Sequence, residues 1–155
     1  MLNSAELSKL LDQTQNIAKS VGAFIRKERQ HFDVKNVEHK GFNDLVSYVD
    51  KEAERQIVEQ LSVIFPEAGF ITEEGTNTTR AEVYNWVIDP LDGTKEFIKR
   101  NGEFTVNIAL INRGKPVIGL IGHPPSKTIW YAVGKNAFVI KNNKIKNLLF
   151  SNSSS

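Results

Sequence analysis

The sequence contains no cysteine among its 155 residues. Disulfide scaffolds, thiolate zinc sites and cysteine nucleophiles are therefore excluded. No hydrophobic run approaches the roughly 20 residues of a membrane-spanning helix. The polar, amphipathic N-terminus also lacks the basic start, apolar block and cleavage site of a signal peptide. We therefore expect a cytoplasmic protein without a membrane partner.

An excess of charge of either sign is also missing. The sequence has 20 Lys and Arg residues and 18 Asp and Glu residues, so its net charge is only +2. Because nucleic-acid-binding proteins carry basic surfaces, often interleaved with aromatic residues, no nucleic-acid partner is expected. The composition, 40% hydrophobic and 25% charged, is typical of a globular domain, and this length allows one domain with a substantial core.

Hydrophobic periodicity predicts two long helices followed by strands. Apolar residues recur at three- and four-residue steps over residues 5–30, with Ser4 as the expected N-cap. A second helix is expected over residues 51–65, with Asp50 as its N-cap. Helices followed by closely spaced strands predict an α+β fold in which two long helices pack on an antiparallel β-sheet. The expected strands are 70–72, 84–88, 105–111, 116–122, 128–133 and 137–141, with turns at 112–115, 134 and 142–143.

Two aspartates three residues apart, Asp89 and Asp92, are the main chemical feature. They follow the expected strand 84–88, and carboxylates at a strand end can share a hard cation such as Mg²⁺. Gly93 and Thr94, at the expected start of a short helix, offer backbone amides to an anion. A metal beside an anion site suits phosphoryl transfer to water. A solvated Asp-Pro turn is the alternative, and for an isolated Asp-x-x-Asp it is the commoner outcome.

Three acidic motifs in order resemble the inositol monophosphatase superfamily of lithium-sensitive, magnesium-dependent phosphatases. The segment from Trp86 to Thr94 resembles its signature, Glu73 and Glu74 lie at the expected distance upstream, and residues 44–50 look like its earlier acidic motif. The resemblance covers essentially the whole chain.

The resemblance implies a role for each matching residue. Glu73, Asp89 and the backbone carbonyl of Leu91 would hold one Mg²⁺, and Asp89 and Asp92 would share a second. Glu73 and Thr94 would orient the attacking water. The remaining roles are phosphate and substrate binding by Gly93, Thr94, Asp92 and Lys95, an outer third metal site at Asp50 with Lys40 nearby, and support of the metal ligands by Glu74.

Two substrate classes remain open. Residues 95–111 look like those of 3'(2'),5'-bisphosphate nucleotidases, which convert 3'-phosphoadenosine 5'-phosphate to AMP. The positive charges of Lys95, Lys99 and Arg100 suit a substrate with two phosphate groups. Residues 41–50 look closer to inositol monophosphatases, so inositol 1-phosphate is the alternative substrate.

Members of this family usually have two halves, and the Trp-Asp motif of the second half is missing here. Its aspartate would complete the second metal site. We therefore expect residues 1–150 to form the N-terminal metal- and phosphate-binding domain, and residues 151–155 to begin a linker to a C-terminal α/β domain. The resemblance also implies a homodimer. A truncated domain without catalytic activity is the remaining alternative.

Overall fold

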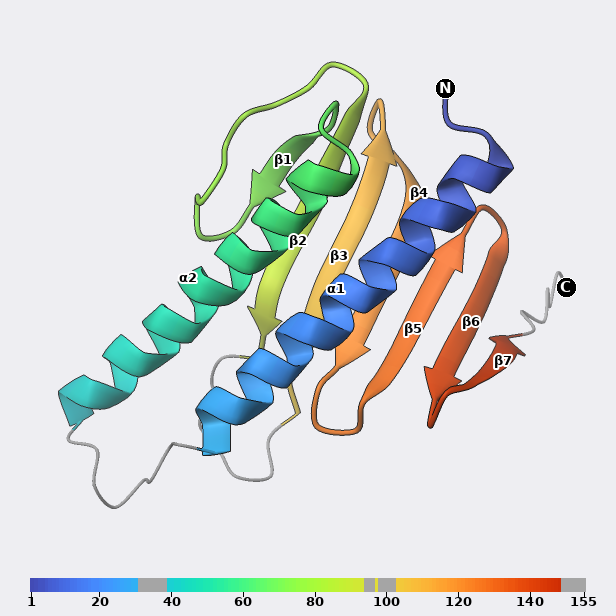
Figure 1. Ribbon diagram of the computed structural model, residues 1–155. Coiled ribbons are helices and arrows are strands. Elements are labelled where there is room, and N and C mark those ends of the chain that lie inside the picture. Colours follow the sequence, from blue (N-terminus) through green and yellow to red (C-terminus); the bar gives the residue numbers. More distant parts are fainter. Residues whose placement is uncertain (31–38, 94–96, 98–102, 149–155) are drawn as a thin grey trace, which may run out of the picture.

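The computed structural model describes residues 1–30, 39–93, 97 and 103–148, with the backbone alone for residues 39–45 and 47. Two helices, α1 (Ser4–Gln30) and α2 (His39–Ile64), lie side by side across one face of a sheet (Figure 1). The α+β fold expected from the sequence is confirmed.

Helix α1 occupies the predicted range, but its N-cap is Asn3 and not Ser4. The Asn3 side-chain oxygen accepts a hydrogen bond from the Glu6 amide at 2.8 Å. The Asn3 side-chain nitrogen donates to the Glu6 carboxylate at 2.7 Å. Because the helix already begins at Ser4, the residue before it is the one whose side chain can reach the free amides of the first turn.

Helix α2 begins at His39, well before the predicted start at residue 51. The prediction that Asp50 caps this helix is therefore wrong, because Asp50 lies within it. Val46 and Val49 are buried and extend the apolar stripe of Ala53 and Ile57 toward the N-terminus. This stripe packs on the sheet and supports the additional turns.

Within the described residues the sheet has seven strands, and their spatial order follows the chain. The two-residue turns at 113–114 and 142–143 both have positive φ at each residue, as in type I′ hairpins, which confirms the predicted turns. The last strand was not assigned from the sequence, since its residues are mostly exposed and give no alternating pattern. The strands are β1 (Gly69–Thr72), β2 (Tyr84–Asp92), β3 (Thr105–Asn112), β4 (Lys115–His123), β5 (Thr128–Val133), β6 (Asn136–Lys141) and β7 (Lys144–Leu148).

One pairing differs from the antiparallel sheet expected from the sequence. Strand β1 runs parallel to β2, whereas all later neighbours in the described sheet are antiparallel. The long connection over residues 73–83 carries the chain back to the start of β2, as a parallel neighbour requires (Figure 1).

The core fills the space between the two helices and one face of the sheet. Its largest fully buried side chain is Trp86 of β2, which joins apolar residues from both helices and from β3 and β4. Both described helices cover the same sheet face (Figure 1). The register partners Ile121 of β4 and Trp130 of β5 are 46% and 40% exposed, as expected for side chains on the uncovered face. Within the described part of the chain, no helix has the length and apolar character needed to cross a membrane.

Candidate functional site

The parallel pairing of β1 with β2 brings two predicted metal ligands together. Thr72, the last residue of β1, is the register partner of Ile88 in β2. Glu73 directly follows β1 and Asp89 directly follows Ile88 within β2, so these two residues lie next to each other at the C-terminal end of β1. Neighbouring strands are roughly 4.8 Å apart, which places two carboxylates within reach of one small ligand.

The aspartate motif lies inside β2 rather than after it, which corrects the expected strand end at residue 88. The ladder to β3 shifts between Asp89 and Asp92, whose partners are Asn107 and Thr105. Three steps on β2 therefore match two steps on β3, which defines a β-bulge, and Pro90 has no amide to donate there. Because partners two residues apart share a sheet face, the bulge brings Asp89 and Asp92 onto one face.

The surroundings of Asp89 disfavour its charged form. Its pKa rises to about 7, first because of burial and then because of contact with Glu73 and the charge of Asp92, although the Leu91 backbone opposes the shift. Its Oδ1 atom is buried and has no hydrogen-bond partner among the described residues. An unpaired buried carboxylate oxygen beside two further carboxylates fits a hard divalent cation.

Asp50 of α2 belongs to the same acidic group. Burial raises its pKa to about 7, with contributions from the charges of Glu74, Glu73 and Asp89. Among the residues described, no three acidic or histidine side chains already stand in a metal-ligating arrangement. Carboxylate oxygens are nevertheless the donors that a hard divalent cation such as Mg²⁺ prefers, so the chemistry of this acidic group fits such a cation.

Gly93 forms the tight turn that follows the aspartates. Its φ is +93°, and a Cβ placed on it would lie 2.9 Å from the backbone oxygen of Glu103. Its carbonyl accepts a hydrogen bond from the Phe97 amide at 2.9 Å. The local packing alone therefore requires glycine here, whether or not a phosphate binds.

Some predicted site residues cannot be placed. Thr94 and Lys95 lie outside the described residues, as do Lys99, Arg100 and the predicted linker at 151–155, and the side chain of Lys40 does too. Leu91 is described and buried, which is compatible with a role for its backbone rather than its side chain.

Two polar residues that the sequence analysis did not select lie against the acidic group. Asn107 is the register partner of Asp89, and its side-chain nitrogen is 3.4 Å from Asp92 Oδ2. Glu54 is fully buried on α2, four residues after Asp50. A signal existed for each: a polar amide within an apolar strand, and a carboxylate on the apolar stripe of a helix.

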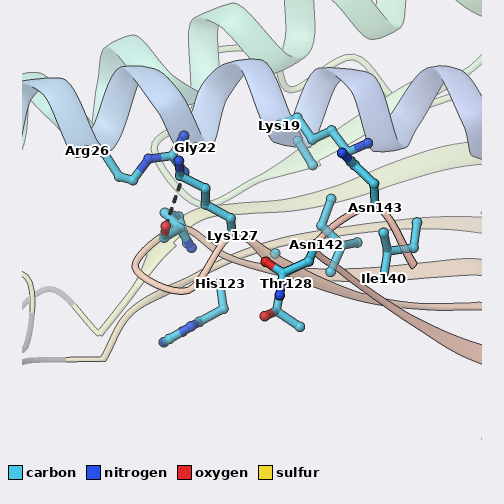
Figure 2. A pocket seen from close by; sticks show the side chains of 13 residues that line it. Lys19, Gly22, Arg26, His123, Lys127, Thr128, Ile140, Asn142 and Asn143 are labelled. Carbon is cyan, nitrogen blue, oxygen red and sulfur yellow. Dashed lines mark hydrogen bonds between the residues drawn. The ribbon is translucent and has the colours of Figure 1, made fainter. Parts of the chain in front are cut away.

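A separate cavity of about 380 Å³ lies between α1 and the strands β4 to β6 (Figure 2). Lys19, Arg26 and Lys127 contribute positive charge to its lining, and Arg26 Nη1 donates to the Pro124 carbonyl at 3.1 Å. None of the predicted catalytic or metal-binding residues lines it. The acidic group at the β1–β2 edge, rather than this cavity, is therefore the candidate for the predicted chemistry.

Fold and site together define an α+β domain with an acidic group suited to a divalent metal. The model of the inositol monophosphatase family matches residues 6–153, and the chain belongs to that family. The resemblance seen in the sequence motifs is thus confirmed.

Similar proteins include both enzyme classes considered above. The 3'(2'),5'-bisphosphate nucleotidase CysQ of Buchnera aphidicola is 41% identical over 133 residues, covering 84% of this chain and 50% of the relative. A fructose-1,6-bisphosphatase/inositol-1-monophosphatase of Aquifex aeolicus is 34% identical, covering 86% of this chain and 51% of the relative. The SuhB structure from Mycobacterium tuberculosis aligns with a TM-score of 0.74 at 25% identity, covering 91% of this chain and 51% of that one. The chain thus spans about half the length of the curated relatives it matches.

Proposed function

We propose that this chain carries the metal- and phosphate-binding side of a magnesium-dependent phosphatase that hydrolyses a phosphate monoester of a small metabolite. The observation that carries the proposal is the buried, unpartnered oxygen of Asp89 at the edge where Glu73 and Asp92 also lie. Membership of the inositol monophosphatase family supports the same chemistry.

Each residue has a defined task in this proposal. Glu73, Asp89, Asp92 and the Leu91 carbonyl hold the metal, with Asp50 at an outer position. Bound Mg²⁺ would lower the pKa of water and stabilise negative charge on the phosphoryl group. Glu73 and the Thr94 hydroxyl orient the attacking water. The Gly93 and Thr94 amides and Lys95 hold the phosphate, and Asp92 also contacts the substrate.

The proposed substrate is a nucleoside 3'(2'),5'-bisphosphate such as 3'-phosphoadenosine 5'-phosphate. The higher identity to CysQ than to the Aquifex protein supports this choice. Inositol 1-phosphate is the second candidate, because the name of the Aquifex relative includes that activity.

The test combines metal binding with phosphate release. Mn²⁺ binding to this chain is measured by electron paramagnetic resonance for the wild type, Asp89→Asn and the exposed control Glu59→Gln. We expect the control to bind like the wild type and Asp89→Asn to lose at least tenfold in affinity, since a ligand charge is removed. A wild-type chain that binds no Mn²⁺, or equal affinity in Asp89→Asn, would refute the metal assignment.

Phosphate release is then measured with Mg²⁺ from both candidate substrates, with and without Li⁺, in this chain and in any longer product of its gene. Release from the nucleotide alone supports the proposed substrate, and release from inositol 1-phosphate alone replaces it. No release from either protein would favour a domain without catalytic activity.

A further inference from the structure

Glu54 is a carboxylate with 0% of its surface exposed. It lies in the middle of α2 on the side that packs against the sheet. Burying a carboxylate is costly unless hydrogen bonds replace its lost hydration. The partners of Glu54 therefore indicate what the residue is for.

Within the described part of the chain, the hydrogen bonds to Glu54 come from the loop after β1. Its Oε1 accepts from the Glu74 amide at 2.9 Å, and its Oε2 accepts from the Thr76 amide at 3.0 Å. The Thr76 hydroxyl also donates to Oε2. Hydrogen bonds to a carboxylate are about twice as strong as those between neutral groups, so these three bonds fasten the loop to α2.

The fastened loop carries the proposed metal ligand Glu73. Gly75 lies between the two amides that donate to Glu54. Its φ is +71°, and no atom lies within 4 Å of the position a Cβ would take, so packing at this residue does not restrain the loop. Glu73 itself is exposed, and it precedes the first anchored amide by one residue. The bonds to Glu54 therefore restrain the residues that directly follow Glu73, alongside the bond from the Thr72 hydroxyl to the Asn77 carbonyl at 3.1 Å.

We propose that Glu54 is the positioning residue that fixes the Glu73–Thr76 loop and so holds the Glu73 carboxylate beside Asp89. The proposal rests on the proposed function and adds a residue that touches neither metal nor substrate. A carboxylate is required because two backbone amides and one hydroxyl converge on its two oxygens. A glutamine would turn an NH₂ group toward one of these donors.

The test uses Glu54→Gln with Glu52→Gln as the matched control. Glu52 lies on the same helix, and among the described residues its side chain accepts hydrogen bonds only from Arg55 and Gln56. Amide hydrogen exchange by NMR reports on the loop, and Mn²⁺ binding by electron paramagnetic resonance reports on the site. In Glu54→Gln we expect exchange at Glu74 and Thr76 to quicken at least tenfold and Mn²⁺ affinity to fall about tenfold, with neither change in the control.

Two outcomes would overturn the proposal: unchanged exchange at Glu74 and Thr76, or unchanged Mn²⁺ affinity. Unchanged affinity with a lower melting temperature would mark a purely structural role. If Glu54→Gln does not fold, Thr76→Val removes only the hydroxyl bond. It should then quicken exchange at Thr76 and weaken Mn²⁺ binding by a smaller factor, and no change in either overturns the proposal. A wild-type chain that binds no Mn²⁺ defeats the proposed function and the metal-positioning role together, whereas the exchange data separately decide whether Glu54 anchors the loop.

Discussion

Replacing Gly93 by alanine isolates the steric demand at the turn beside the aspartates. The new Cβ would lie 2.9 Å from the Glu103 backbone oxygen, closer than unstrained packing allows. Gly114 is a matched control, because its φ of +83° is close to the +93° of Gly93 while its surroundings are open. Both variants pay for positive φ, and only Gly93→Ala must also move the backbone of a neighbouring segment.

The magnitudes follow from these two contributions. Left-handed backbone costs a non-glycine residue about 1 to 2 kcal/mol, and the stiffer unfolded chain returns about 0.4 to 1 kcal/mol. Gly114→Ala should therefore lower the free energy of unfolding by about 1 kcal/mol. Overpacking against the Glu103 backbone adds about 1 to 3 kcal/mol, so Gly93→Ala should lose about 2 to 4 kcal/mol.

Urea unfolding followed by circular dichroism, with both variants beside the wild type, measures the difference directly. Losses that agree within about 0.5 kcal/mol, the usual limit of additivity, would show that the approach to Glu103 does not constrain this turn. The glycine would then have to be explained by phosphate binding rather than by packing.

Three further changes test other parts of the structure. The pKa of Asp50 is raised to about 7 in the folded protein, so the unfolded chain releases this proton at a lower pH than the folded protein does. The protonated Asp50 therefore does not destabilise the fold below about pH 4, whereas its charged form lowers the free energy of unfolding as pH rises through about 7. In EDTA at pH 8, Asp50→Asn should thus be more stable than the wild type by about 1 to 2 kcal/mol, a value that already allows for solvent screening. Near pH 4 the two proteins should be equally stable. A gain in stability at both pH values would contradict this explanation. Asn3→Ala should cost about 1 kcal/mol in urea unfolding, whereas Ser4→Ala should cost much less, and the reverse order would restore Ser4 as the cap. Trp86→Phe should cost less than about 1.5 kcal/mol, because removing a buried N–H that has no partner among the described residues offsets much of the lost packing. A loss above about 3 kcal/mol would show that this N–H is satisfied.

Much of the fold was predictable because local rules decide it. The periodicity of α1 and the paired positive-φ turns at 113–114 and 142–143 follow from short-range sterics and burial. The start of α2 was not predictable in the same way. Polar residues before Asp50 interrupt the pattern, and only packing on the sheet justifies the longer helix.

The candidate site, like the fold, was predictable only in part from the sequence. The order and spacing of Glu73, Asp89, Asp92 and Gly93 are properties of the sequence, and they sufficed to predict carboxylate chemistry and the family. The polar side chains of Glu54 and Asn107 at apolar positions are visible in the sequence. Their partners, Glu74 and Asp92, lie 20 and 15 residues away along the chain, so only the tertiary structure shows what these two residues contact.

By itself, then, the sequence determined which groups are available, namely acidic oxygens, a tight glycine turn and two amphipathic helices. The tertiary structure decided how they meet. Because β1 is parallel to β2, Glu73 lies next to Asp89. An antiparallel β1 would place Glu73 near the opposite end of β2. The bulge at Pro90 then turns Asp92 onto the face of Asp89. Strand direction and register depend on contacts between segments far apart in the chain, which no local pattern of residues encodes.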